Sequence, residues 1–212
     1  MRISEIFYSI QGEGVYTGVP MVFVRLQGCP YRCTWCDSVY TWDTTAGEEQ
    51  TLEQVLAAVA QWPATHVCIT GGEPLAQPQD FLALARALKQ RLYWIEVETA
   101  GGIAIPHDAP IDSWVVDVKC PASGMERINK LATLPLLRPA DQVKFVVASR
   151  ADFDFALAVL RQHPTSAQAL FTPAWGQLEP ETLVEWVKAE APQARLSLQA
   201  HKFIWGPARR GV

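Results

Sequence analysis

The sequence predicts an α/β protein built on a parallel sheet. Short runs rich in β-branched and aromatic residues alternate along the chain with segments that have helical periodicity. Such alternation indicates βαβ units, in which a helix connects each strand to a parallel neighbour. Polar motifs also follow several of the strand-like runs directly, where the carboxyl ends of parallel strands bind ligands. No linker-like segment or close repeat divides the chain, so residues 1–212 are predicted to form a single domain.

Seven runs are predicted to be strands, and valine, isoleucine and aromatic residues, which favour extended structure, dominate the first five of them. The first run, PMVFVRLQ, ends at a cysteine-rich loop, and the second, HVCIT, ends at a pair of glycines. In chain order the predicted strands cover residues 20–27, 66–70, 93–98, 114–118, 142–147, 169–172 and 195–198.

Four segments between these runs are predicted to be helices, since their apolar residues recur three or four positions apart. They cover residues 52–61, 80–91, 152–162 and 180–191. The segment 121–139 is less regular, and it predicts a weak helix followed by a proline-rich stretch.

Composition excludes several classes of protein. A chain of 212 residues with 49% hydrophobic and 19% charged residues is long enough for one α/β core. The net charge of −4 gives no electrostatic reason to expect direct binding to nucleic acid. The sequence has neither a signal peptide nor an apolar run long enough to span a bilayer, and three of its five cysteines are clustered. These features predict a cytoplasmic protein that uses its thiols as metal ligands rather than in disulfides.

The cluster of cysteines is the most informative motif. Cys29, Cys33 and Cys36 lie on one short loop with the spacing CxxxCxxC. Three thiolates are one too few for a structural zinc site, whereas a [4Fe–4S] cluster held by three cysteines keeps one iron open to a small molecule. A zinc site completed by Cys68 or Cys120 is the alternative. Cys68 lies inside a predicted buried strand, however, and Cys120 directly follows another, which makes both weak candidates.

Three further polar motifs end predicted strands: TGGEP at residues 70–74, ET at residues 98–99 and DVK at residues 117–119. Alone, the pair Gly71 and Gly72 is no more than a turn signal. Next to a metal-binding loop at the same sheet edge, it predicts a place where the backbone closely approaches a ligand.

The motif CxxxCxxC with Trp35 before its last cysteine, together with GGEP at residues 71–74, resembles the signature of the radical S-adenosylmethionine (SAM) superfamily. Within it the chain resembles the 7-carboxy-7-deazaguanine synthase family over nearly its whole length. The similar segments are IFYSIQGEG at 6–14, VRLQG at 24–28, DS at 37–38, VET at 97–99, DVKCP at 117–121, VKF at 143–145 and QAHK at 199–202.

The resemblance implies a fold and a reaction. The fold would be a partial, open β/α barrel with trimmed helices. The reaction would convert 6-carboxy-5,6,7,8-tetrahydropterin to 7-carboxy-7-deazaguanine with loss of ammonia, through a 5′-deoxyadenosyl radical, on the route to queuosine. The implied cofactors are a [4Fe–4S] cluster, SAM and Mg²⁺. The implied partners are an electron donor such as flavodoxin and a second copy of the chain in a homodimer.

The resemblance also implies site residues. Arg25 would bind the substrate carboxylate with its bidentate guanidinium, and the Ser38 hydroxyl would bind Mg²⁺ where relatives commonly have threonine. His201 precedes eleven further residues, and some relatives place their terminal carboxylate near the substrate; the position of Val212 is open. The cluster ligands would be Cys29, Cys33 and Cys36; the SAM contacts Trp35, Gly71, Gly72, Glu73, Glu98, Lys119 and Thr172; and the substrate contacts Ile10, Gln11, Gly12, Glu13, Arg25, Thr70 and His201.

Structural roles compete with several of these assignments. A lone arginine on a strand is usually an ion-pair residue, QGEG at residues 11–14 would suit a turn, and Ser38 would suit a helix N-cap. Two other functions also remain: a radical SAM activase that makes a glycyl radical on a partner protein, and a zinc-stabilised binding module without chemistry.

Overall fold

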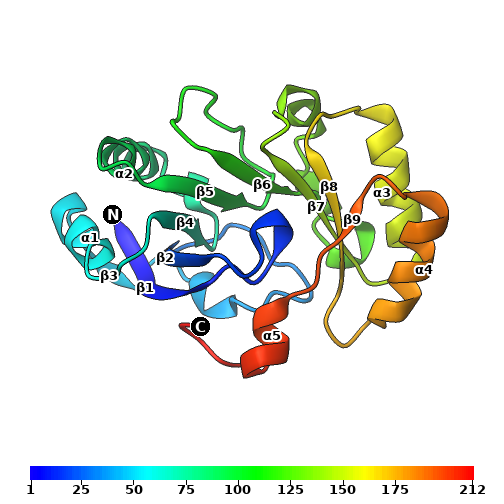
Figure 1. The fold of residues 1–212 in the computed structure, drawn as a ribbon, viewed down its shortest axis with the longest axis horizontal. Helices are drawn as coiled ribbons and strands as arrows, with labels where there is room; N and C mark the ends of the chain where they lie inside the picture. The colour runs from blue at the N-terminus through cyan, green and yellow to red at the C-terminus, as the bar shows by residue number, and fades with distance from the viewer.

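The computed structural model describes residues 1–212, and its centre is one nine-stranded sheet with the order β3-β1-β2-β4-β5-β6-β7-β8-β9 (Figure 1). The strands are β1 (Arg2–Ile10), β2 (Pro20–Leu26), β3 (Glu48–Glu49), β4 (His66–Gly71), β5 (Trp94–Thr99), β6 (Ser113–Asp117), β7 (Gln142–Val147), β8 (Gln168–Pro173) and β9 (Arg195–Leu196).

From β2 to β9 every neighbouring pair in the sheet is parallel, which confirms the predicted parallel sheet and all seven predicted strands. The strands β1 and β3 were not predicted, and both pair antiparallel. Most residues of β1 are only half-buried because it lies near an edge, so its sequence lacks the apolar run of a central strand. With two residues, β3 is too short for any period to show.

The four predicted helices are present and all lie between strands of the parallel sheet. Thr51 begins the first with a capping box, and Ser149 caps the third by accepting a hydrogen bond from the Asp152 N–H. A fifth, six-residue helix near the C-terminus was not predicted because it is too short to show a period. The helices are α1 (Leu52–Val59), α2 (Pro78–Gln90), α3 (Arg150–Gln162), α4 (Pro180–Glu190) and α5 (Ala200–Trp205).

Two crossovers lack an α-helix. The connection from β5 to β6 has no helix of any kind, and the one from β6 to β7 contains only short 3₁₀ helices. The weak helix expected within 121–139 is therefore not an α-helix, and the segment forms only short 3₁₀ helices. Pro135 lies inside the last 3₁₀ segment, where its ring prevents the backbone hydrogen bonds of an α-helix.

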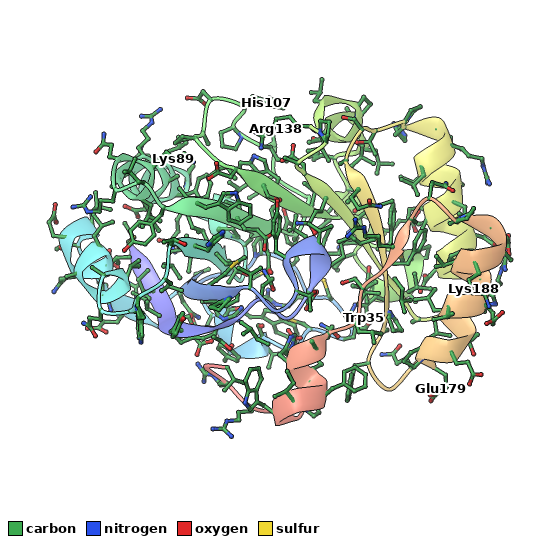
Figure 2. All side chains as sticks on the ribbon, viewed as in Figure 1. Trp35, Lys89, His107, Arg138, Glu179 and Lys188 are labelled. Carbon is green, nitrogen blue, oxygen red and sulfur yellow. The ribbon has the colours of Figure 1, made fainter.

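The two faces of the sheet differ in character. On β7, Val143, Phe145 and Val147 belong to the apolar core shared with the helices, while Gln142 and Lys144 alternate onto the opposite face. Polar side chains such as Lys89 and Lys188 lie on the outside of the helices (Figure 2). No helix has the length and apolar character needed to cross a bilayer.

The sheet is open, because β3 and β9 are its edges and no ladder joins them. It is nevertheless curved enough for its ends to meet across the polar face. The loop after β1 contacts the segment after β9, where the Ala200 N–H donates to the Gly12 carbonyl at 2.8 Å. Curvature, open edges and missing helices agree with the expected partial barrel.

Candidate functional site

The polar face of the sheet opens into two adjoining cavities at the carboxyl ends of the strands. The first, which we call the cysteine cavity, has a volume of about 410 Å³ and contains the clustered cysteines. The second, the tail cavity, has a volume of about 200 Å³ and is bordered by the last residues of the chain. Both cavities are lined by Glu13, Arg25, Asp37, Ser38, Glu98, Lys202 and Pro207, so the two cavities adjoin one another.

The cysteine loop follows β2, and it brings all three clustered sulfur-bearing side chains to one cavity. Cys29, Cys33 and Cys36 line the cysteine cavity, and every cysteine of the chain is an unpaired thiol. Burial raises the pKa of Cys29 to about 11 and also raises the pKa of Cys33, although Lys119 opposes the latter shift. A metal centre bound here would therefore have to displace thiol protons.

The glycine pair after β4 packs directly against this loop. A Cβ atom on Gly72 would lie 2.4 Å from the Gly28 carbonyl oxygen and 2.7 Å from the Cys29 Cβ. Gly71 has φ +152°, and a Cβ there would lie 2.3 Å from the Leu26 carbonyl oxygen. The strand end and the cysteine loop can approach this closely only because both residues lack a side chain.

No fourth cysteine joins the three. Cys68 is fully buried beside Met21 and Phe23, and Cys120 is buried with its thiol directed to the Val118 carbonyl. Neither lines the cysteine cavity. The donor set thus fits a cluster with one open position better than a closed four-cysteine zinc site.

A chain of alternating charges crosses the cysteine cavity. Lys119 pairs with Asp117 at 2.5 Å, Asp117 with Lys144 at 3.2 Å, and Lys144 with Glu13 at 2.9 Å. Burial by itself raises the pKa values of Asp117 and Glu13, but the neighbouring lysines more than offset it, and both values are lowered. Burial lowers the pKa of Lys144, yet its two carboxylate partners raise it well above the ordinary value. All four groups are therefore charged near neutral pH.

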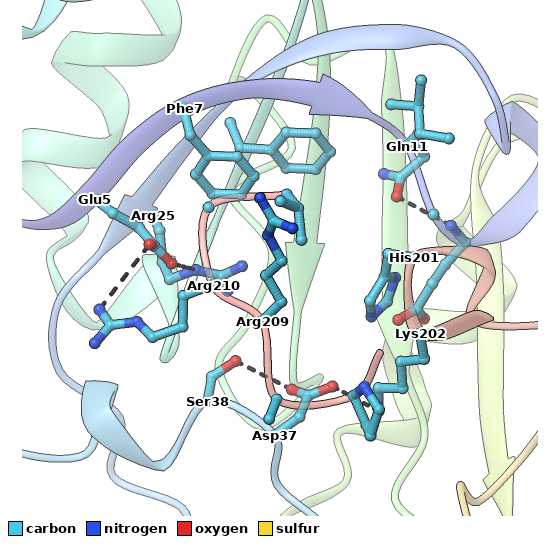
Figure 3. Close-up of a pocket in the computed structure, with 18 of the residues that line it drawn as sticks. Glu5, Phe7, Gln11, Arg25, Asp37, Ser38, His201, Lys202, Arg209 and Arg210 are labelled. Carbon is cyan, nitrogen blue, oxygen red and sulfur yellow. Dashed lines mark hydrogen bonds and ion pairs between the residues drawn. The ribbon is translucent and has the colours of Figure 1, made fainter. Parts of the chain in front are cut away.

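The tail cavity contains a positively charged wall (Figure 3). Arg25 donates from Nε to Glu5 at 2.8 Å, and Glu5 also accepts from the Tyr40 hydroxyl at 2.8 Å. The two Nη atoms of Arg25 have no hydrogen-bond partner in the protein, and the residue faces both cavities. Arg209 and Arg210 line the same cavity from the C-terminal segment, which ends at Val212 against it.

Ser38 lies at the junction of the two cavities. It occupies the N-cap position of a 3₁₀ turn but makes no side-chain capping bond, and its hydroxyl donates to Asp37 at 3.1 Å. Asp37 pairs with Lys202 at 2.9 Å. Although burial raises the pKa of Asp37, Lys202 lowers it to about 2. The junction thus presents a hydroxyl and an ionised carboxylate, both oxygen donors of the kind that Mg²⁺ prefers.

Comparison with known proteins identifies the family. Residues 10–102 match the protein family described as a 4Fe-4S single cluster domain. The chain is 38% identical to 7-carboxy-7-deazaguanine synthase of Koribacter versatilis, with 100% of both chains covered, and 39% identical to that of Chlorobaculum tepidum, with 100% of this chain and 97% of the relative covered. The chain belongs to the 7-carboxy-7-deazaguanine synthase family. Its fold also matches the crystal structure of QueE from Escherichia coli, with a TM-score of 0.72, 27% identity and 94% of each chain covered.

The structure brings most of the residues implied by this family together. The three cysteines, Trp35, Gly71, Gly72, Lys119 and Thr70 line the cysteine cavity; Ile10, Gln11, Gly12 and His201 line the tail cavity; and Glu13, Arg25, Ser38 and Glu98 line both.

Glu73 and Thr172, the other two residues expected to contact SAM, line neither cavity. The Glu73 side chain is fully buried and accepts hydrogen bonds from the Thr99 hydroxyl and the Leu75 and Ala100 N–H groups, so it fastens the GGEP turn to the end of β5. Burial raises its pKa. Thr172 is also fully buried, and it pairs in the sheet with Val146, which lines the cysteine cavity.

The sequence analysis did not identify several residues that line the two cavities. Lys144 was detectable as a single cation within an apolar strand, and Asp117 belonged to a strand-end motif. Trp175, which follows β8, and the last six residues of the chain carried no local signal, because only the folded path of the chain brings them to the cavities.

Proposed function

We propose that this chain converts 6-carboxy-5,6,7,8-tetrahydropterin to 7-carboxy-7-deazaguanine with release of ammonia, as a carbon–nitrogen lyase of the radical SAM type. Full-length membership of the synthase family supports this function. The observation that carries it is that a three-cysteine cavity adjoins a second cavity to which Arg25, Arg209 and Arg210 contribute guanidinium groups. One cavity suits a metal cluster with its cofactor, and the other suits an anionic small molecule.

The cysteine cavity would hold the [4Fe–4S] cluster on Cys29, Cys33 and Cys36. SAM would lie beside it, against Trp35, Gly72 and Lys119, where the glycine backbone allows a close approach. When bound, the cluster and SAM supply the one-electron chemistry that removes a hydrogen atom from the substrate.

Residues at the junction of the two cavities and in the tail cavity would bind and orient the pterin. The free Nη atoms of Arg25 would receive the substrate carboxylate as a bidentate pair. The loop from Ile10 to Glu13 would border the ring, and the C-terminal segment would exclude water from the tail cavity.

Magnesium would bind at Ser38 together with substrate oxygens, since its hydroxyl makes no capping bond and lies where the cavities meet. Ser38→Ala is expected to lower turnover by about tenfold while SAM affinity stays unchanged. The measurement is a magnesium titration of the rate with both proteins. A variant and parent that respond identically to magnesium would refute this assignment.

The remaining assignments follow the family resemblance. The chain would act in the cytoplasm, where its unpaired thiols stay reduced, as a homodimer supplied with electrons by a flavodoxin-like donor. It would act on a free pterin in the queuosine pathway rather than on nucleic acid, in keeping with its net charge of −4.

The test is anaerobic reconstitution with iron and sulfide, followed by incubation with SAM, dithionite, magnesium and 6-carboxy-5,6,7,8-tetrahydropterin. We expect 7-carboxy-7-deazaguanine from the parent and none from Cys33→Ala. Cleavage of SAM without that product would retain the radical SAM assignment and reject the substrate, as expected for an activase of glycyl radical enzymes. Retention of zinc alone would reject the cluster.

A further inference from the structure

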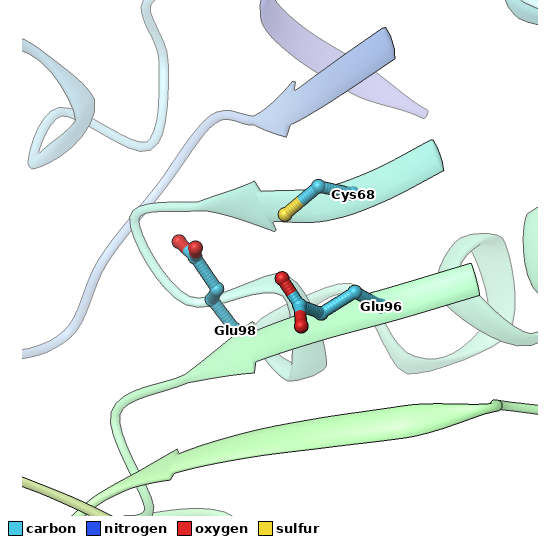
Figure 4. A group of neighbouring side chains, drawn as sticks. All are labelled: Cys68, Glu96 and Glu98. Carbon is cyan, nitrogen blue, oxygen red and sulfur yellow. The ribbon is translucent and has the colours of Figure 1, made fainter. Parts of the chain in front are cut away.

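Glu96 lies on β5, and its side chain lines neither the cysteine cavity nor the tail cavity. It is 1% exposed, beside Glu98 and Cys68 (Figure 4). Its two carboxylate oxygens serve two different amides. The Gln11 Nε2 group donates to Oε1, and the Gln142 Nε2 group donates to Oε2 at 2.9 Å.

The same two amides hold the loop after β1 at both ends. The Gln11 Oε1 atom accepts from the Glu13 N–H at 3.1 Å, and the Gln142 Oε1 atom accepts from the Val15 N–H at 2.9 Å. Between them, a Cβ on Gly14 would lie 2.3 Å from the Gln142 Oε1 atom. The loop of residues 11–15 is therefore fastened to the sheet by these two amides, which meet at Glu96 and also donate to Glu98 at 3.1 Å and to the Ser113 hydroxyl at 3.2 Å.

The polarity of this arrangement matters. Burial raises the pKa of Glu96 to about 8. Above that pH its carboxylate is ionised and only accepts hydrogen bonds, so each amide must turn its N–H group to Glu96 and its carbonyl to a loop N–H. If either amide rotated by half a turn, an N–H group would face the N–H group of Glu13 or Val15. Glu96 thus determines the orientation of both amides and, through them, the conformation of the loop.

The geometry points to Glu96 as a positioning residue for substrate binding: it fixes the loop of residues 11–15 in the shape that borders the pterin. This inference rests on the proposed function, because it takes that loop to contact the substrate. A metal site at Cys68, Glu96 and Glu98 does not explain the cluster, because Glu96 already accepts an amide hydrogen bond on each oxygen, and Glu98 accepts from Gln11 and Thr70.

The first variant is Glu96→Gln, which keeps the shape and adds one N–H donor. Whichever way the new amide turns, one N–H group of the network or of the loop then faces another donor. Loss of one buried hydrogen bond in the loop predicts a rise of about tenfold or more in the dissociation constant for 6-carboxy-5,6,7,8-tetrahydropterin. The dissociation constant for SAM is expected to stay within twofold, because Glu96 does not line the cysteine cavity.

The second variant exchanges the carboxylate at position 96 with the amide at position 142. In Glu96→Gln/Gln142→Glu the residue at position 96 can donate to position 142 while still accepting from Gln11, and position 142 still accepts from the Val15 N–H. Every loop hydrogen bond is restored, so pterin affinity should return to within threefold of the parent. Gln142→Glu alone places two carboxylates together and should weaken pterin binding.

The measurement is anaerobic calorimetric titration of each reconstituted protein with SAM and with the pterin at about pH 9, above the Glu96 pKa of about 8. Tenfold weaker pterin binding in Glu96→Gln, recovered in the exchange variant, supports the inference. Parent-like pterin affinity in Glu96→Gln, or no recovery in the exchange variant, overturns it while leaving the proposed function intact. A parent that binds SAM but not the pterin would overturn the proposed function and this inference together.

Discussion

Replacing Lys144 with methionine tests the buried charges of the site. The change keeps an unbranched side chain but removes the ammonium group that lies 2.9 Å from Glu13 and 3.2 Å from Asp117. The three side chains are between 10% and 17% exposed, so water compensates for the lost partner only in part. Lys144→Met therefore leaves two buried carboxylates with one cation fewer.

The expected loss is large. Removing one partner of a buried ion pair costs about 3–5 kcal/mol of unfolding free energy, because the remaining charge stays desolvated. Asp117 keeps Lys119 at 2.5 Å and Glu13 keeps a hydrogen bond from Gln199 at 2.8 Å. Because these contacts remain, we expect the loss of unfolding free energy to lie near the lower limit of that range, at about 3 kcal/mol at pH 7.

The loss should depend on pH. Against the opposing effect of burial, Lys144 helps to hold the pKa values of Glu13 and Asp117 below their ordinary values of 4.5 and 3.8. Groups with a lowered pKa stabilise the fold above those values, and this stabilisation disappears as the pH falls through the folded-state pKa. The difference between variant and parent should thus be greatest near pH 7 and shrink as the pH falls below about 4.

Urea unfolding followed by tryptophan fluorescence at pH 7 and about pH 3 measures both effects. Lys188→Met is the matched control, because Lys188 pairs with Glu185 on the surface with side chains 65% and 62% exposed. This control should unfold like the parent. The reasoning is refuted if Lys144→Met loses no more stability than Lys188→Met, or loses as much at about pH 3 as at pH 7.

Three further changes test other parts of the site. Gly72→Ala places a Cβ 2.4 Å from the Gly28 carbonyl oxygen and should displace the cysteine loop. We expect a loss of about 1–3 kcal/mol of unfolding free energy and less iron bound per chain after reconstitution. Undiminished iron content would contradict this prediction. Burial and the neighbouring Glu98 raise the pKa of Glu96 from 4.5 to about 8, so the parent should lose unfolding free energy, on the order of 5 kcal/mol, as the pH rises through this window. Glu96→Gln should remove this fall of the unfolding free energy with pH. If the unfolding free energies of variant and parent changed in parallel with pH, Glu96 would not be its source. Arg25→Lys loses the bidentate guanidinium and should lower kcat/KM for the pterin by about tenfold to a hundredfold. The dissociation constant of SAM should not change. An equal loss in SAM affinity would contradict the assignment of Arg25 to the substrate carboxylate.

Local sequence determined the parallel strands, four helices and the cysteine loop. Each of these depends on near neighbours: a β-branched run, a periodic apolar face, or a fixed spacing of thiols. Three clustered cysteines also indicated a cluster with an open position before any geometry was known. Short or edge elements such as β1, β3 and α5 escaped prediction because they lack a buried face of their own.

Only the tertiary structure decided which side chains meet across the open barrel. Glu13 and Lys144 are 131 positions apart, and they pair because the curved sheet folds the loop after β1 over β7. Glu73 belongs to a motif that predicts a cofactor contact, yet its buried carboxylate ties the turn to β5 instead. Sequence spacing fixes what a short segment can form, whereas the direction that a side chain faces depends on strand register and on the distant elements packed above it.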